Sequence, residues 1–385
     1  MANDIIAANL KRIRGAQGLS QDRVAEAAGL SRSAYRNVES GDVEPRVRNL
    51  EAIASALKVP VRQLLEPCVE LRNVRFRSHK KLRTRNQILT DVGRWLSDYN
   101  SLEEILVCHR PFRLAGTAAA AGARVGEDRA IAVARAARAS LGLTGDEPIR
   151  DICGLLDSAG VKVCPMPVAS DGFFGLSVGP SDGGPAVVVN TWDRISVERW
   201  IFSAAHELGH LLLHLDDYGE EQQEEDPEHE READAFAAEF LMPDAVFQRE
   251  WAESRGLPLV DRVIKVKRIF RVSYRTVLHR LAPTYTGWGN IWVRFQADYK
   301  SATGQSLSKT DEPSALAETE FLTAAPEVLR GREPDHLSAG DFREDRLAGL
   351  VRRAAEAGEI SLGRGAEILG ISVKEMRTLS ASWVG

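Results

Sequence analysis

Residues 196–214 read SVERWIFSAAHELGHLLLH, and this stretch decides the fold of the central part of the chain. Ser196 is a suitable N-cap, and the apolar residues that follow it predict a helix. His206 and His210 are four residues apart, so they project from one face of that helix, where two imidazoles can share a metal ion. Glu207 lies between them in sequence, where a carboxylate can accept a proton from a metal-bound water and later deliver it to a leaving amine.

A second helix, rich in carboxylates, follows the histidines. Residues 228–243 read EHEREADAFAAEFLMP and predict a helix that ends before the proline. A catalytic zinc ion takes three protein ligands and keeps a water, and two histidines with one glutamate form a recognised set. We predict one zinc ion per chain, with Glu232 as the third ligand and Glu228 and Glu230 as the nearby competitors. The alternative is an HExxH pattern that occurs by chance in an ordinary amphipathic helix.

Shorter apolar runs precede the histidine helix. Residues 161–168, 173–178 and 186–190 are rich in β-branched or aromatic residues and are separated by Gly, Pro, Ser and Asp, so they predict a small antiparallel sheet or meander. Residues 127–141 and 149–159 predict helices. The predicted fold class is therefore α+β, mostly α.

Residues 1–67 predict five short helices. The second and third are joined by a turn containing glycine, inside a compact helical unit, and this pattern describes a helix-turn-helix. The third helix would present polar side chains that read base edges or bind phosphates, and Gln21 at a helix N-terminus would hold a backbone phosphate. The predicted DNA-binding residues are Gln21, Ser31, Arg32, Ser33, Arg36 and Asn37. The alternative is a helix-turn-helix that serves only protein contact or dimerisation.

The charge is distributed unevenly along the chain. The formal net charge is −5, yet residues 1–94 hold 18 Lys and Arg against 10 Asp and Glu. Most of this excess lies in residues 68–94, with 8 basic side chains against 2 acidic ones. We interpret residues 68–94 as a basic linker or helix. A basic stripe beside a DNA-binding domain would add salt-dependent attraction to phosphates.

Residues 19–59, LSQDRVAEAAGLSRSAYRNVESGDVEPRVRNLEAIASALKV, resemble the XRE, or lambda-repressor-like, DNA-binding domain. The markers are Gln21 at the start of the second helix, Gly29 in the turn, Ser31 as the cap of the recognition helix, and Glu39 with Gly41 at its end. The resemblance implies a double-stranded DNA operator as a partner. A palindromic operator would require a homodimer, since two half-sites need two-fold symmetry.

A second resemblance covers about residues 87–283. ERWIFSAAHELGHLLLH, EREADAFAAEFLMP and the later IFRVSYRTVLHRL are together similar to the ImmA/IrrE family of zinc metallopeptidases. The resemblance implies a zincin-like domain, here residues 95–283, in which His206, His210 and Glu232 bind zinc and Glu207 is the general base and acid. Arg199 matches the arginine that precedes the zinc helix of the family.

The family resemblance also implies a substrate. Family members are known for cutting helix-turn-helix repressors, which relieves repression after DNA damage or in mobile elements. The usual pattern has peptidase and repressor on separate chains, whereas both are fused here. We expect a DNA-binding regulator that cleaves a helix-turn-helix repressor or antitoxin in a stress, mobile-element or phage-defence response. The alternatives are a regulator whose peptidase-like domain only senses a metal or ligand, and a component of a toxin-antitoxin system.

The sequence does not single out a side chain that would donate a hydrogen bond to the oxyanion of the reaction. His214, His229 and Tyr218 are the candidates, although an isolated His or Tyr is more often structural. Residues 216–230, DDYGEEQQEEDPEHE, are heavily acidic and predict a solvated surface loop. A loop that recruits a basic substrate or covers the cleft is the alternative.

The composition is that of a soluble globular protein. The chain has 385 residues, enough for two or three domains, with 44% hydrophobic and 27% charged residues. No apolar run approaches the roughly 20 residues of a membrane helix, and no signal-peptide pattern opens the sequence, so we expect no membrane partner. The four cysteines form no CxxC pair, which favours a reducing cytoplasm.

Residues 284–385 lie beyond both resemblances. Residues 288–295, WGNIWVRF, predict a strand, and residues 301–318 predict a linker or long loop. Within residues 344–382 a long helix, a glycine turn and two shorter helices predict a helical hairpin or a helix-turn-helix-like module. This last module resembles those of small antitoxin-like regulators, and docking to protein is the alternative to DNA contact.

Overall fold

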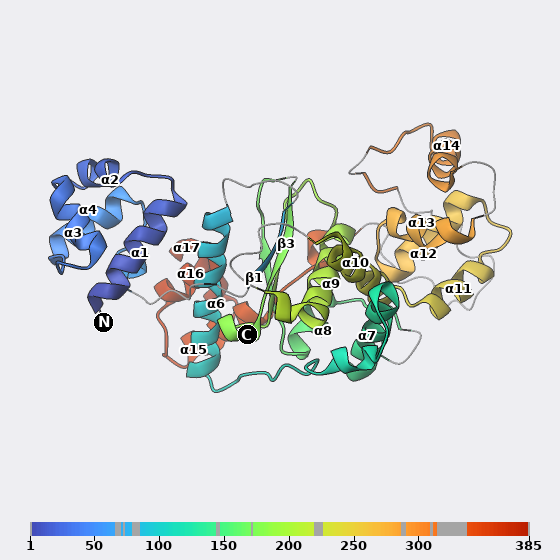
Figure 1. The fold of residues 1–385 in the computed structure, drawn as a ribbon, viewed down its shortest axis with the longest axis horizontal. Coiled ribbons are helices and arrows are strands. Elements are labelled where there is room, and N and C mark those ends of the chain that lie inside the picture. Colours follow the sequence, from blue (N-terminus) through green and yellow to red (C-terminus); the bar gives the residue numbers. More distant parts are fainter. Residues whose placement is uncertain are drawn as a thin grey trace.

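The computed structural model describes residues 2–65, 71, 74–78, 85–143, 147–170, 172–218, 226–285, 290–308, 311–313 and 337–383. Figure 1 shows a group of N-terminal helices at one end of the molecule, then a second helical group that contains the C-terminal helices, then a small sheet, and further helices at the other end. The predicted fold class, α+β with mostly α, is confirmed.

The N-terminal helices form a bundle of their own. Ser20 and Ser31 cap the second and third helices through their side chains, and Gly29 takes the positive φ of 65° that the turn between them requires. A separate apolar cluster, which includes Leu10, Tyr35 and Ile53, fills the centre of the bundle. The five helices are α1 (Ala2–Ala16), α2 (Gln21–Ala27), α3 (Arg32–Ser40), α4 (Val47–Ala56) and α5 (Arg62–Leu65).

The sheet has four strands in the order β1-β3-β4-β2. β3 is antiparallel to both β1 and β4, but β2 is parallel to β4, so the prediction of a purely antiparallel sheet or meander is wrong for this pair. The strands are β1 (Val74–Ser78), β2 (Lys162–Met166), β3 (Phe173–Val178) and β4 (Ala186–Asn190). β1 comes from the segment interpreted as a linker or helix, and it extends the sheet at the edge next to β3.

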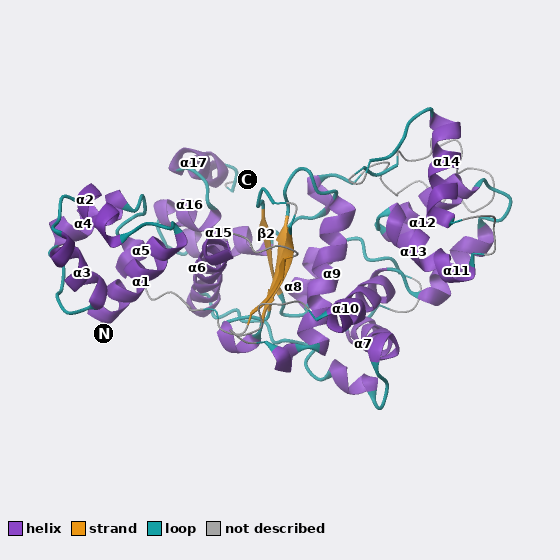
Figure 2. Ribbon diagram, turned by 45° about the horizontal axis from the view of Figure 1, so that its top comes forward, coloured by secondary structure: helices purple, strands orange, loops and turns teal. Residues whose placement is uncertain are grey.

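Both faces of the sheet are covered. Val187 and Val189 of β4 point into the cluster that includes helix α9 (Val197–Leu213), whereas Val188 points into the cluster with helix α6 (Arg85–Ile105). Figure 2 shows α6 and α9 on opposite sides of the strands. A parallel pair is stable in this position because helices bury both of its faces.

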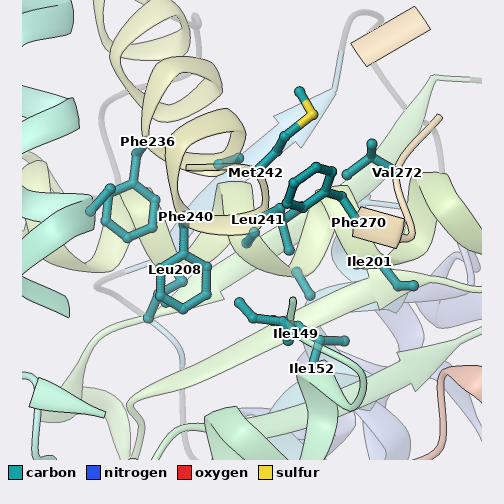
Figure 3. Close-up of a cluster of buried hydrophobic side chains, with 14 of the residues drawn as sticks. Ile149, Ile152, Ile201, Leu208, Phe236, Phe240, Leu241, Met242, Phe270 and Val272 are labelled. Atoms are coloured by element: carbon teal, nitrogen blue, oxygen red, sulfur yellow. The ribbon is translucent and has the colours of Figure 1, made fainter. Parts of the chain in front are cut away.

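The cluster on the α9 side is the largest apolar core. Phe236, Phe240 and Leu241 of one helix meet Leu208 of α9 and Phe270 of a later helix (Figure 3). Helices in this part of the molecule are α7 (Gly126–Ser140), α8 (Ile152–Ser158), α10 (Pro227–Leu241), α11 (Asp244–Glu253), α12 (Leu259–Phe270), α13 (Tyr274–Leu281) and α14 (Ile291–Thr303). None of the described helices is long and apolar enough to cross a membrane.

Helix α14 corrects one prediction. The sequence predicts a strand at residues 288–295, but Asn290 caps a helix there, and Ile291, Phe295 and Tyr299 are buried at helical spacing against the core. Apolar residues four apart, Ile291, Phe295 and Tyr299, indicate a helix. This pattern becomes visible only when residues beyond the predicted strand at 288–295 are included. Residues 288–289 of the predicted strand lie outside the described residues.

The C-terminal helices pack on α6 rather than on the large core. Leu350, Val351 and Met376 share a buried cluster with Tyr99 and Leu102 of α6. Buried Glu103 of α6 also forms ion pairs with Arg346 and Lys162, which joins this unit to β2. The three helices are α15 (Arg346–Glu356), α16 (Leu362–Leu369) and α17 (Val373–Ala381), as the helix-turn-helix-like pattern predicted.

One buried carboxylate connects three helices of the N-terminal bundle. Glu39 on α3 accepts hydrogen bonds from Arg14 on α1, from Gln21 on α2, and from Tyr35. Burial alone would raise the pKa of Glu39, but these hydrogen bonds hold it below its usual value. The ionised carboxylate is therefore a stabilising element of the bundle.

Glu39→Gln should lower the free energy of unfolding of the bundle by about 2 kcal/mol at pH 7, because it removes the charge that pairs with Arg14. The folded-state pKa is depressed, so this advantage of the wild type is complete above about pH 4.3 and is lost as the pH falls further. Hydrogen exchange of residues 2–65 in the full chain measures the difference. Exposed Glu26→Gln is the control, and equal protection in all three proteins would refute the role of Glu39.

Candidate metal centre

Helix α9 brings its two histidines together in a fully buried place. Ser196 caps the helix, and apolar side chains bury it on nearly all sides. The side chains of His206 and His210 have no solvent exposure, and their Nε2 atoms lie 2.9 Å apart. The spacing of four residues therefore places two metal-binding nitrogen atoms at one point, as the sequence predicted.

Glu230 supplies the third group at this point. Its Oε2 atom lies 3.3 Å from His206 Nε2, and its Oε1 atom lies 3.2 Å from His210 Nε2. In the described part of the chain, these three residues form the one group of His, Cys, Asp and Glu with converging ligand atoms. A tetrahedral zinc ion with bonds of about 2.0–2.1 Å separates its ligand atoms by about 3.3 Å, which matches the two nitrogen–oxygen distances. The two Nε2 atoms lie closer together than this, at 2.9 Å.

The structure does not bring Glu232, the predicted third ligand, to the two nitrogen atoms. Its Oε2 atom lies 2.8 Å from His214 Nε2 and accepts a hydrogen bond of 3.0 Å from Arg129 on α7. A helix turns by about 100° per residue, so carboxylates two residues apart point in very different directions. Glu230, one of the two competitors in the sequence, lies in the place predicted for Glu232.

Each histidine of the pair is held through its second ring nitrogen. His206 Nδ1 lies 2.8 Å from Asp234 Oδ1, and His210 Nδ1 lies 2.9 Å from His214 Nδ1. If Nε2 of His210 binds a metal, its proton is on Nδ1 and is donated to His214. His214 then carries its own proton on Nε2 and donates it to Glu232. Such supports fix the tautomer and orientation of a ligating histidine.

His210 and His214 are neutral. Burial lowers the pKa of His210 to about 3 and that of His214 to about 2. Burial opposes ionisation of Glu230, but the hydrogen bonds with His206 and His210 hold its pKa below the usual range. Neutral imidazoles beside an ionised carboxylate are the protonation states in which these groups bind a metal ion.

Glu207 points to the sheet side of α9. Its Oε2 atom accepts a hydrogen bond of 2.9 Å from Ser177 Oγ on β3. Tyr218 OH lies 2.7 Å from the same Oγ, and it is the donor because the serine proton goes to Glu207. A Cβ atom at Gly175 would lie 3.0 Å from Glu207 Oε1 and 2.8 Å from the carbonyl oxygen of Val188, so glycine leaves room for this carboxylate.

Close packing of α9 against α10 sets the distance between the histidines and Glu230. A Cβ atom at Gly209 would lie 3.0 Å from Cδ1 of Phe236 and 3.3 Å from its Cβ. The small residue in HELGH thus lets the phenylalanine of α10 approach the backbone of α9. A larger residue here would move α10, and with it Glu230, away from the histidines.

Arg75 is a residue of this site that the sequence reasoning missed. It lies on β1, where its Nη1 atom is 3.1 Å from His229 Nδ1 and its Nη2 atom is 3.4 Å from Glu230 Oε1. In the sequence, Arg75 is one of the 8 basic side chains of residues 68–94. The alternation of VRFRS at residues 74–78 is the signal for a strand that places its arginines on one face.

The predicted DNA-binding residues lie on the outer surface of the N-terminal bundle. Arg32, Ser33, Arg36 and Asn37 are exposed on α3, and Ser31 caps this helix. Gln21 also opens α2 as expected, but its side chain donates to Glu39. Arg32 forms an ion pair of 2.9 Å with exposed Asp22. The four residues of α3 thus form one exposed row on a helix of the kind that enters a major groove.

Comparison with protein families agrees with both parts of this geometry. Residues 10–64 match the family described as "Helix-turn-helix", and residues 156–282 match the peptidase family described as "IrrE N-terminal-like domain". The chain joins an XRE-type helix-turn-helix to an IrrE-like domain. A comparison with curated protein sequences gives no match.

The IrrE-like domain has a donor set that suits zinc. Two neutral imidazoles and one carboxylate are the ligands of many catalytic zinc sites, and they leave a fourth position for water. His206, His210 and Glu230 would hold the ion. Of the site residues, Arg75 and Arg129 come from outside the matched segment 156–282, so neighbouring segments complete the site.

The three oxyanion candidates of the IrrE-like domain have other contacts. Both ring nitrogens of His214 are engaged with His210 and Glu232, and Tyr218 OH contacts Ser177. His229 stacks on His214 with ring centroids 4.2 Å apart.

Arg199 lies with its guanidinium 4.6 Å from the ring centroid of Phe174, a cation–π contact near the start of α9.

Measurements of zinc affinity distinguish the role of Glu230 from that of Glu232. Glu230→Gln should weaken zinc binding by about 100-fold or more, since it removes a direct ligand. Glu232→Gln acts only through His214 and should weaken binding by about tenfold or less. Competition with a chelator measures both affinities, and exposed Glu228→Gln is the control for a lost charge on α10. The reverse order of effects would assign the third ligand to Glu232.

Proposed function

We propose that this chain is a DNA-binding regulator whose IrrE-like domain hydrolyses peptide bonds with one zinc ion. The observation that carries the proposal is the place of Glu207. It lies on the same helix as the two histidines, one residue from His206, with one oxygen held by Ser177. A purely structural metal site has no use for a buried carboxylate in this position.

The proposed reaction divides its tasks among these residues. A zinc ion held by His206, His210 and Glu230 would supply Lewis acidity toward water and a peptide carbonyl. Glu207 takes the proton from the attacking water and delivers it to the leaving amine. Ser177 donates to one oxygen of Glu207 and so holds the orientation of the carboxylate that would take the proton. Arg75, with its charge next to Glu230, adds positive potential where the oxyanion develops.

The proposed substrate is a helix-turn-helix repressor or antitoxin. Support comes from the likeness of the domain to the ImmA/IrrE family and from its fusion to a helix-turn-helix in this chain. In this proposal the protein works in the cytoplasm, as a homodimer on an operator, in a stress, mobile-element or phage-defence response. A domain that only senses a metal or ligand, and a toxin-antitoxin component, are the competing functions.

Glu207→Gln tests the peptidase activity. The variant should keep its zinc, because Glu207 is not a ligand, and should lose proteolysis by about 100- to 10,000-fold, because the general base is gone. New protein N-termini are compared in cells that express the wild type, Glu207→Gln or the control Glu228→Gln. The same set of N-termini from wild type and Glu207→Gln would refute the peptidase and favour the sensor function.

Arg36→Ala tests DNA binding by the N-terminal bundle. Arg36 is exposed on α3, and removing one contact to a base or phosphate should weaken binding by about 10-fold. The probe is a duplex selected from a randomised library by the wild-type chain, and fluorescence anisotropy measures the affinity. Arg255→Ala, an exposed arginine between α11 and α12, is the control. Unchanged affinity in Arg36→Ala would remove this residue from the DNA interface.

A further inference from the structure

The C-terminal unit repeats the N-terminal helix-turn-helix position by position. Residues 20–40 read SQDRVAEAAGLSRSAYRNVES, and residues 361–381 read SLGRGAEILGISVKEMRTLSA. The two segments align without a gap and are identical at 7 of 21 positions. In the structure, α2 and α3, with 7 and 9 residues, correspond in order to α16 and α17, with 8 and 9 residues.

The hydrogen bonds of the two turns are also the same. Ser20 accepts from the backbone three residues on at 3.2 Å, and Ser361 does so at 3.1 Å. Gly29 and Gly370 both have a φ of 65°. Ser31 and Ser372 then cap α3 and α17, each accepting from the backbone three residues on at 3.2 Å.

A backbone hydrogen bond between residues five apart closes the turn between the two helices in both units. Leu30 N donates to the carbonyl oxygen of Ala25 at 2.9 Å, and Ile371 N donates to that of Ala366 at 3.0 Å. One inward position agrees as well: Tyr35 and Met376 align, and both have 0% exposure. Two segments with the same caps, the same turn and this shared buried position present their second helices in a similar way, although α3 also buries Val38 whereas the aligned Leu379 of α17 is exposed.

The outer face of α17 is free for a ligand. Met376 is its one buried residue, whereas Lys374, Arg377 and Thr378 are exposed. Arg377 aligns with Arg36, a predicted DNA contact of α3. Glu375 is the acidic residue of this helix, and its carboxylate accepts from Ser372 at the helix start. The basic side chains therefore dominate the face that corresponds to the DNA-reading face of α3.

The unit is anchored on its other side. Leu350 and Val351 of α15 pack on α6, and Arg364 of α16 binds Asp98 of α6. Figure 2 shows α17 as the outermost helix of the group formed with α6, α15 and α16. Arg62 of the N-terminal bundle lies 3.7 Å from Glu367 of α16, so the two helix-turn-helix units are neighbours. The contacts that hold the unit leave α17 exposed.

We propose that residues 361–381 form a second DNA-binding site, in which Lys374 and Arg377 of α17 contact double-stranded DNA. This site goes beyond the matched helix-turn-helix at residues 10–64 and does not depend on peptidase activity. Lysine and arginine bind phosphates or guanine edges, and exposed Val373 can contact a thymine methyl group. One chain would then contact two segments of a duplex, one through α3 and one through α17.

The test compares three full-length proteins on one duplex. The duplex is selected from a randomised library by the wild-type chain, and its affinity is measured by fluorescence anisotropy at several salt concentrations. Lys374→Ala/Arg377→Ala should weaken binding about 10-fold or more and reduce the salt slope by about 2, since two cationic contacts are lost. The hydroxyl-radical footprint of Lys374→Ala/Arg377→Ala should be shorter than that of the wild type. Arg36→Ala should still protect the part of the duplex that Lys374→Ala/Arg377→Ala leaves unprotected.

Arg353→Ala is the matched control. Arg353 is exposed on α15 of the same unit, but it lines a cavity with Arg110 and Asp157, away from α17. It should bind as the wild type does. Both substituted side chains of α17 are exposed, and thermal unfolding of each variant confirms that the unit remains folded.

The outcomes separate this proposal from DNA binding by the N-terminal bundle. The proposal of a second site is overturned if Lys374→Ala/Arg377→Ala has the same DNA affinity, salt slope and footprint as the wild type. This holds even if Arg36→Ala loses binding. Weakened binding and a shorter footprint in both variants support two sites. Weakened binding in the C-terminal variant alone supports the second site and argues against the contact proposed for Arg36.

Discussion

The contact between α9 and α10 is the constraint on which the metal centre depends. Two imidazoles separated by one helical turn cannot complete a zinc site by themselves, and the carboxylate has to come from another helix. Gly209 allows Phe236 to lie against the backbone of α9, and this close approach brings Glu230 within 3.3 Å of His206 Nε2. The same core of Phe236, Phe240 and Leu208 therefore stabilises the fold and sets the metal geometry (Figure 3).

Segments outside the peptidase-family match build the surroundings of this centre. Arg75 arrives on β1, directly after the N-terminal bundle, and Arg129 arrives on α7. Each donates to one of the two competing glutamates, Glu230 or Glu232. The strand that follows the N-terminal bundle thus touches the candidate metal centre, so β1 connects the helix-turn-helix to the IrrE-like domain.

Most helices followed from local signals in the sequence. Serine caps and glycine turns placed α2, α3, α16 and α17 to within about a residue, because these signals act within one helical turn. Local signals in the sequence did not predict three features. These are the direction of the strands, the strand β1, and the helix at residues 291–295. They depend on burial against distant segments, such as the cover that α6 and α9 give to both faces of the sheet.

The sequence by itself placed His206, Glu207 and His210 on one helix and the exposed row on α3, since helical spacing alone places these side chains on known faces. It narrowed the candidates for a third metal ligand to three glutamates. Only the tertiary structure separated Glu230 from Glu232, because the rotation of α10 about its axis is set by packing against α7 and α9. The role of Arg75 likewise arose only when β1 joined the sheet.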